Sequence, residues 1–342
     1  MKKVLIFSLA VSLIGCKAQQ SRDIGDANPM EYANTITAGE LKEHLYTFAS
    51  DEFQGRDTGE PGQKMAAEYL KTEYKKLDIA SPFGEDDYYQ EIPGSYFTRG
   101  EIKDTENVLA YIKGSSNPEE VLVISSHYDH VGVDAEGNIF NGADDDGSGT
   151  VAILEIAEAF KKAQADGYTP KRSILFLNVT GEEKGLVGSK FYSENPVFPL
   201  ANTVANLNID MIGRIGEGME SAGDYVYLIG SDRLSTELHE ISEEVNKKYM
   251  NLNLDYTFNE ENDPNRFYYR SDHYHFAKHD IPIIFYFNGV HEDYHRPTDT
   301  PDKIEYDLLE KRAKLIFLTA WEIANRETRP FVDKPTLTEA AE

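Results

Sequence analysis

The chain has 342 residues, 40% of them hydrophobic and 11% aromatic, which suits a packed globular protein. Its 34 basic and 60 acidic residues give a formal net charge of −26. Such a charge repels nucleic acids and anionic membrane surfaces, so we expect neither as a binding partner. The length is large for one domain, but α/β enzymes of this size often keep a single core, and we expect one large domain.

The N-terminus has the pattern of a secretory signal: two lysines, then an apolar stretch over residues 4–14 that is too short to cross a bilayer. The segment LIGC resembles the bacterial lipobox, in which the cysteine becomes the first mature residue and carries lipid. Cys16 is the only cysteine, so the chain has no intrachain disulfide and no thiolate metal site. We predict a lipid anchor at Cys16 on the extracytoplasmic side of a bacterial membrane; a plain signal peptide is the alternative.

The remaining sequence divides into a tether, a folded body and a tail. A signal peptide over residues 1–15 is followed by polar residues 16–34, for which we expect a flexible tether with little order. Residues 35–330 are predicted to form a single folded domain, and residues 331–342 a polar tail. At the start of this domain, helical spacing predicts two helices flanking the loop ASDEFQGRDTGEPG.

The body alternates apolar strands with amphipathic helices. Strands are predicted at 108–113, 121–126, 174–179, 203–209, 226–229 and 281–287, and helices at 148–163, after 185, and at 235–249 and 307–325. This alternation predicts an α/β fold with a mostly parallel, mixed β-sheet covered by helices on both faces. In such sheets, binding sites form beyond the carboxyl ends of the strands.

Acids and histidines follow several of these apolar runs. They lie in SSHYDH (His127 and Asp129), NGADDDGSG (Asp144, Asp145 and Asp146), TGEEKG (Glu182 and Glu183), NLNIDMIG (Asp210) and DYHRPTDT (His295). Two imidazoles and several carboxylates at strand ends are suitable ligands for a pair of divalent cations, with one carboxylate left to move protons. We therefore predict a hydrolase with two zinc ions.

Each motif also has a simpler interpretation. The acid triplet could be a solvated turn or a calcium loop, although the alternating acids of an EF-hand are absent. The Glu182–Glu183 pair could be a solvated loop; in an extended backbone its two side chains would point in opposite directions, one to a metal and one to the substrate water. Asp129 is the natural hydrogen-bond partner of a metal-binding His127. Spacing alone cannot distinguish His295 from its rivals, which are His130, His273, His275, His279 and His291.

Taken together, the motifs resemble a family of two-zinc exopeptidases that includes secreted bacterial leucyl-type aminopeptidases, glutamate carboxypeptidase II, the transferrin receptor and, more distantly, glutaminyl cyclase. The resemblance covers residues 35–325 and includes the loop before residue 65, the five motifs above, and RSDH between the fourth and fifth. It implies a zinc-dependent exopeptidase fold of the phosphorylase/hydrolase-like type. By this resemblance Asp145 bridges both zincs, often with a cis peptide to the next residue.

The same resemblance assigns the remaining roles. His127 and Asp210 complete one zinc site, and Glu183 and His295 complete the other. Glu182 becomes the general base, and Tyr294 a candidate hydrogen-bond donor to the scissile carbonyl. No covalent intermediate is needed, in agreement with the absence of a G-x-S-x-G elbow.

These features favour an aminopeptidase acting on peptides outside the cytoplasm. A carboxypeptidase or dipeptidase, or a glutaminyl cyclase, on the same fold is the alternative; the cyclase works with a single zinc. A non-catalytic binding module is a third interpretation, which the complete ligand set argues against. The segment 259–270 (NEENDPNRFYYR) does not match the basic carboxylate-binding clusters expected of a glutamate carboxypeptidase, and it is predicted to be an aromatic-rich lid.

Overall fold

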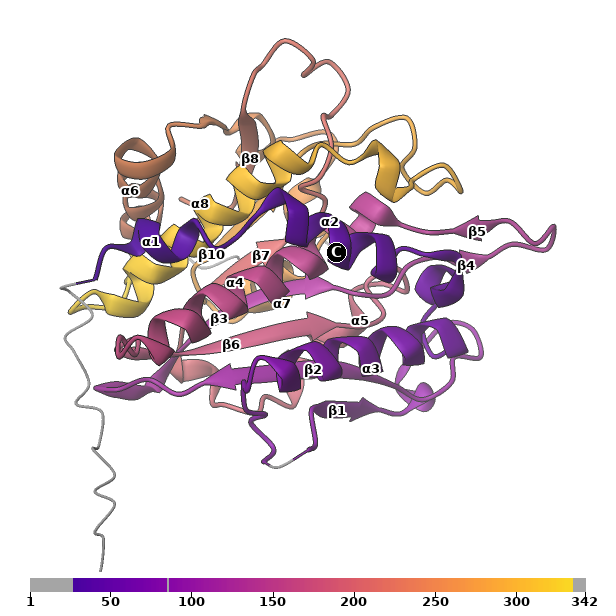
Figure 1. The fold of residues 1–342 in the computed structure, drawn as a ribbon, viewed down its shortest axis with the longest axis horizontal. Helices are drawn as coiled ribbons and strands as arrows, with labels where there is room; N and C mark the ends of the chain where they lie inside the picture. The colour runs from indigo at the N-terminus through magenta and orange to yellow at the C-terminus, as the bar shows by residue number, and fades with distance from the viewer. Residues whose placement is uncertain (1–26, 85, 335–342) are drawn as a thin grey trace, which may run out of the picture.

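The computed structural model describes residues 27–84 and 86–334 (Figure 1). Eight strands form one sheet in the order β1-β2-β6-β3-β7-β10-β8-β9. The four central strands β6, β3, β7 and β10 are parallel. β1 and β2 pair antiparallel with their neighbours, and β8 pairs antiparallel with β10 but parallel with β9. The strands are β1 (Tyr89–Ile92), β2 (Thr105–Ile112), β3 (Asn117–His127), β6 (Arg172–Val179), β7 (Thr203–Ile209), β8 (Tyr225–Ile229), β9 (Asn253–Asp255) and β10 (Ile283–Phe287). The predicted mixed, mostly parallel sheet is confirmed.

Helices cover both faces of this sheet, as predicted. One face carries α1 (Pro29–Ala33), α2 (Ala38–Phe48), α3 (Pro61–Lys76), α4 (Gly149–Ala165), α6 (Thr236–Val245) and α8 (Tyr306–Asn325), whose apolar side chains share one core cluster. The opposite face carries the shorter α5 (Val187–Glu194) and α7 (His273–Ala277), which belong to a second cluster. Two further strands, β4 (Gly132–Val133) and β5 (Ile139–Phe140), form a projecting hairpin (Figure 1).

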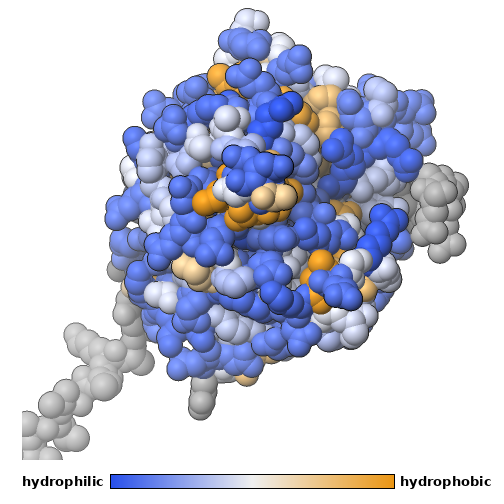
Figure 2. All heavy atoms as spheres, turned by 90° about the vertical axis from the view of Figure 1, so that its right-hand side faces the viewer, coloured by the Kyte–Doolittle hydropathy of each residue, from blue (hydrophilic) through white to orange (hydrophobic). Residues whose placement is uncertain are grey.

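The central strands are buried on both faces, which explains their nearly continuous apolar sequence. Every residue of β6 and β7 is buried. Because the four central strands are parallel, their carboxyl ends meet at one edge of the sheet, on the right in Figure 1. Figure 2 looks onto this end of the molecule, where hydrophobic residues gather near the middle of a mostly hydrophilic face. The motif residues follow these strand ends.

The ordered body begins earlier than the predicted boundary at residue 35. Helix α1 lies inside the segment expected to be a tether, and the Asn28 side chain caps it by accepting a hydrogen bond from the Met30 N–H at 3.2 Å. Tyr32 is 4% exposed and its ring stacks on Trp321 of α8. This aromatic contact stabilises a segment whose polar composition indicated little order.

Several terminal predictions lie outside the described residues. These are the signal peptide, the anchor at Cys16, and residues 335–342 of the tail. Within the part that the structure describes, no helix combines the length and the hydrophobicity required to span a membrane.

A buried carboxyl in α4 makes the stability of this fold depend on pH. Glu155 is 2% exposed, and its Oε1 lies 3.4 Å from His44 Nε2. Burial raises the pKa of Glu155 from 4.5 to about 8, and burial lowers the pKa of His44, so both groups are neutral near pH 7. A carboxyl whose pKa rises on folding contributes its full stability below its unfolded pKa, and this contribution is lost as the pH rises through the folded pKa.

The substitution Glu155→Gln replaces the titrating carboxyl with an amide of similar shape. We expect the free energy of unfolding of the wild type, relative to that of the variant, to fall as the pH rises from 4.5 to about 8, by about 4 kcal/mol. Urea unfolding of both proteins at several pH values measures this difference, and pH effects common to both proteins cancel. Parallel stability curves for the two proteins would contradict the prediction.

Candidate metal centre

Three consecutive acids precede α4, and their side chains have different surroundings. Asp144 Oδ1 accepts a hydrogen bond from the Gly213 N–H at 2.6 Å, and Asp146 Oδ1 accepts one from the Met211 N–H at 3.0 Å. These two carboxylates therefore hold the turn against the segment that follows β7. The Oδ2 atom of Asp145 is buried and accepts no hydrogen bond. The peptide bond between Asp145 and Asp146 is cis, as the resemblance implied.

One group of possible ligands contains His127, Asp145 and Asp210. The Nε2 atom of His127 lies 3.2 Å from Asp145 Oδ1 and 3.6 Å from Asp210 Oδ1. The other ring nitrogen of His127, Nδ1, is 3.0 Å from the backbone carbonyl oxygen of Asp129 and 3.7 Å from its carboxylate. The carbonyl is therefore the closer partner, where the sequence had predicted the carboxylate. Because Nδ1–H donates to this carbonyl, Nε2 is left to bind a cation.

The Asp129 carboxylate instead connects two loops. It accepts hydrogen bonds from the Thr58 hydroxyl at 2.7 Å and from the Glu182 backbone N–H at 3.2 Å. Asp129 is completely buried, so both contacts are shielded from water. This residue therefore helps to position the turn that carries Glu182 and Glu183.

A second group shares Asp145 with the first. The Nε2 atom of His295 lies 3.0 Å from Asp145 Oδ2 and 3.1 Å from Glu183 Oε1. The Nδ1 atom of His130 lies 3.0 Å from the same Glu183 oxygen and 3.7 Å from Asp145 Oδ2. His130 is fully buried and neither of its ring nitrogens has a hydrogen-bond partner among the described residues. The structure thus brings two imidazoles, rather than the single predicted one, to this group.

His130 is the residue that sequence reasoning missed. Its only sequence signal is its place three residues after His127 in SSHYDH. Two of the other rival histidines have different partners: His273 Nε2 lies 2.8 Å from the Tyr268 carbonyl oxygen and His291 Nε2 lies 3.1 Å from Asp144. Neither is a member of the two groups.

A chain of hydrogen bonds between buried side chains holds Asp210 in place. Asn206 Nδ2 donates to Ser125 Oγ at 2.8 Å, Ser125 Oγ donates to Asn208 Oδ1 at 2.7 Å, and Asn208 Nδ2 donates to Ser271 Oγ at 2.8 Å. The Ser271 hydroxyl then donates to Asp210 Oδ2 at 2.6 Å. These bonds fix one oxygen of Asp210 and leave Oδ1 directed at His127. Polar residues in these apolar strands therefore have a structural explanation.

The chemistry of the two groups fits zinc. Each combines imidazole nitrogen with carboxylate oxygen. The ligand atoms of His127, Asp145 and Asp210 lie within 4.8 Å of one another, and so do those of His130, Asp145 and Glu183. Buried His127 Nε2, Asp145 Oδ2 and Glu183 Oε1 have no hydrogen-bond partner, which is costly unless a cation completes them. Burial lowers the pKa of His295, but the close carboxylates of Asp145 and Glu183 outweigh it and raise that pKa to about 10. The carboxylates around His295 give this group a negative charge that suits a cation.

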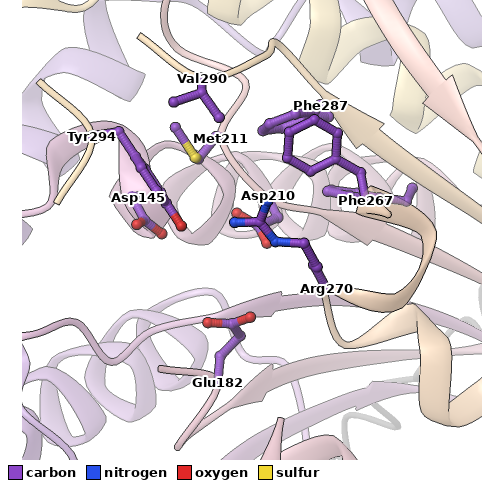
Figure 3. A pocket seen from close by; sticks show the side chains of 10 residues that line it. Asp145, Glu182, Asp210, Met211, Phe267, Arg270, Phe287, Val290 and Tyr294 are labelled. Carbon is purple, nitrogen blue, oxygen red and sulfur yellow. The ribbon is translucent and has the colours of Figure 1, made fainter. Parts of the chain in front are cut away.

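A pocket opens beside the two groups, and Figure 3 shows its lining. Glu182 lies across the pocket from Tyr294, and Asp145 lies beside Tyr294 (Figure 3). Glu182 therefore faces the pocket, while Glu183 belongs to the second group, as their adjacent positions in the sequence had indicated. Burial raises the pKa of Glu182 well above its ordinary value, and the neighbouring Glu183 adds to the rise. The ring of Tyr294 stacks on that of His295.

Two further residues of the lining come from the segment predicted to be a lid. Phe267 and Arg270 both line the pocket. A 3-10 helix, Thr257–Asn259, ends at the first residue of this segment, and a second one, Phe267–Tyr269, lies within it. It therefore forms one wall of the pocket.

Comparison with known proteins identifies the family. Residues 107–320 match the family model described as Peptidase family M28. The chain is 34% identical over 117 residues to the probable glutamate carboxypeptidase LAMP1 of Arabidopsis thaliana, an alignment that covers 34% of this chain but only 16% of that protein.

Solved structures show the same fold. The LapA aminopeptidase of Legionella pneumophila superposes with a TM-score of 0.68 at 20% identity, covering 96% of this chain and 81% of that one. BSAP, a zinc aminopeptidase from Bacillus subtilis, superposes with a TM-score of 0.64 at 17% identity, covering 88% and 99%. With more than half of its length matched by the family model, the chain belongs to peptidase family M28, a family of zinc-dependent peptidases.

Proposed function

We propose that this protein is an aminopeptidase that removes N-terminal residues from peptides and uses two zinc ions per chain. The observation that carries this proposal is the pair of ligand groups that share Asp145, with the free carboxylate of Glu182 in the adjoining pocket. The structural neighbours LapA and BSAP are aminopeptidases, which supports the same activity here.

The proposed ligands follow from the two groups. His127, Asp145 and Asp210 hold one zinc ion. Asp145, Glu183 and His295 hold the other, and His130 is close enough to Glu183 to add a further imidazole. Asp145 can serve both ions because Oδ1 faces His127 and Oδ2 faces His295.

The pocket residues then carry the proton transfers. Bound zinc would lower the pKa of a shared water and polarise the peptide carbonyl. Glu182 accepts the proton of that water and gives it to the leaving amine; its burial suits a carboxylate that must hold a proton between the two events. Tyr294 donates a hydrogen bond to the carbonyl oxygen from the opposite side of the pocket.

Two other types of enzyme activity on the same fold are the alternatives to this proposal. The relative LAMP1 is named as a glutamate carboxypeptidase, so cleavage from the other end, or of dipeptides, is the second candidate. A glutaminyl cyclase would need a single zinc, and the second ligand group argues for two.

We further propose that lipid on Cys16 holds the enzyme at the outer side of a bacterial membrane.

We expect the purified protein to release the first amino acid only from peptides with a free N-terminus. N-acetylated copies of the same peptides should resist cleavage, because an acetylated amine has lost the positive charge that the acidic site favours. Metal analysis of the same sample should find about two zinc ions per chain. Equal cleavage of blocked peptides from the other end would establish a carboxypeptidase instead, and a single zinc with cyclisation of N-terminal glutamine would establish a cyclase.

A further inference from the structure

The substrate pocket has two chemically different sides. One side carries the carboxylates of Asp145, Glu182 and Asp210. The other side is apolar and aromatic, and its residues are Met211, Phe267, Phe285, Phe287 and Val290. Arg270 lies at the boundary of these two sides and is the only cationic residue in the described lining. Figure 3 shows its side chain reaching over the pocket beside Asp210 and Phe267.

Arg270 is held in place without a charged partner. Its guanidinium carbon lies 4.9 Å from the centre of the Phe267 ring, which fixes the side chain by a cation–π contact. Among the residues that the structure describes, no carboxylate forms an ion pair with it, and its side chain donates no hydrogen bond. Its five N–H donors are therefore available to a ligand.

Charge balance indicates what kind of ligand this is. The carboxylates of Asp145, Glu183 and Asp210, with Glu182 as the fourth, would be neutralised by two bound dications, since the coordinating imidazoles are neutral. Arg270 is exposed at the edge of the apolar wall, and among the described residues no carboxylate pairs with it. A guanidinium in this situation binds a carboxylate well, because its planar fork offers two parallel hydrogen bonds.

We propose that Arg270 binds a carboxylate of the substrate, so that the enzyme prefers peptides whose first residue is acidic. The methylene groups of such a side chain pack on the aromatic wall and its carboxylate meets the guanidinium. This inference rests on the proposed aminopeptidase function. The C-terminal carboxylate of a very short peptide is the other source of the same chemistry, and the experiment below distinguishes the two.

The first measurement compares peptides that differ by one charge. Amidated peptides beginning with Glu should be cleaved with a higher kcat/KM than the same peptides beginning with Gln. Arg270→Gln should reduce this Glu-over-Gln preference by about ten- to a hundredfold, which is the range for a charged hydrogen-bonded pair. Arg270→Lys should retain part of the preference because it keeps the charge but not the fork.

The matched control is Arg266→Gln. Arg266 is exposed and its guanidinium carbon lies 5.0 Å from the Tyr269 ring, but it does not line the pocket. This variant should keep the Glu-over-Gln preference. A preference for free over amidated dipeptides that disappears in Arg270→Gln would assign the bound carboxylate to the C-terminus of the peptide and overturn the side-chain assignment. The same Glu-over-Gln ratio in wild type and Arg270→Gln, with no such dipeptide preference, would overturn carboxylate binding altogether.

A second readout does not depend on turnover. Calorimetry should show that free glutamate binds the zinc-loaded wild type more tightly than free glutamine, and that Arg270→Gln removes the difference. If the wild type cleaves no free peptide, the proposed aminopeptidase function fails, and this binding difference still decides the role of Arg270. If cleavage occurs but glutamate and glutamine bind equally, only the carboxylate assignment fails.

Discussion

Glu182→Gln should bind two zinc ions and lose nearly all turnover. Glu182 faces the pocket and is not a member of either ligand group, so the amide should leave both groups intact. The amide cannot accept the proton of the attacking water, and loss of a general base lowers kcat by roughly 10²- to 10⁴-fold. Metal analysis and steady-state kinetics on the same preparation measure both effects, and full activity in this variant would remove Glu182 as the base.

The neighbouring Glu183→Gln provides the matched comparison. It changes the same chemical group one residue further along, but Glu183 Oε1 lies 3.1 Å from His295 Nε2 and 3.0 Å from His130 Nδ1. We therefore expect this variant to lose zinc from the second group as well as activity. The same zinc content in both variants would contradict the assignment of Glu182 as the base and Glu183 as a zinc ligand.

The fold, and the strand ends where candidate ligands lie, could be predicted because each depends on a local pattern; the roles of the individual residues came from the family resemblance. A strand buried on both faces needs a continuous apolar sequence, as in β6, and the first polar residue after it marks the strand end. The structure places the polar residues His127, Glu182 and Asp210 at or just beyond these ends, close together around one pocket. Parallel strands bring their carboxyl ends to one edge, which explains why residues far apart in the sequence meet there.

Other features depend on contacts that a local pattern does not contain. The burial of His130 against Glu183 depends on how the loop after β3 turns, since a lone histidine there could as well face solvent. His127 Nδ1 contacts the Asp129 carbonyl rather than the Asp129 carboxylate. The carboxylate already accepts hydrogen bonds from Thr58 and Glu182, which come from other loops. Arg270 belongs to the RSDH motif, but the motif alone assigned it no role, and its place in the pocket lining depends on the tertiary structure.

Asp145→Asn should remove zinc from both groups and abolish activity. The Asp145 carboxylate is the one ligand that the two groups share, with Oδ1 3.2 Å from His127 and Oδ2 3.0 Å from His295. An amide offers one oxygen and no negative charge, so it cannot offer an oxygen to each group and attracts a cation less strongly. We expect less than about one zinc ion per chain and activity below detection. Asp145→Ala should behave in the same way.

The adjacent Asp144→Asn is the informative contrast, because the triplet contains three identical side chains. Asp144 accepts a hydrogen bond from the Gly213 N–H at 2.6 Å and lies 3.1 Å from His291 Nε2, so its role is to hold the turn. This variant should melt at a lower temperature yet still bind both zinc ions, as metal analysis and calorimetric melting will report. If Asp144→Asn lost zinc and Asp145→Asn kept it, Asp144 rather than Asp145 would be the ligand shared by the two groups. That result would also require the turn before α4 to rotate, since in this structure only Asp145 reaches the imidazoles of both groups.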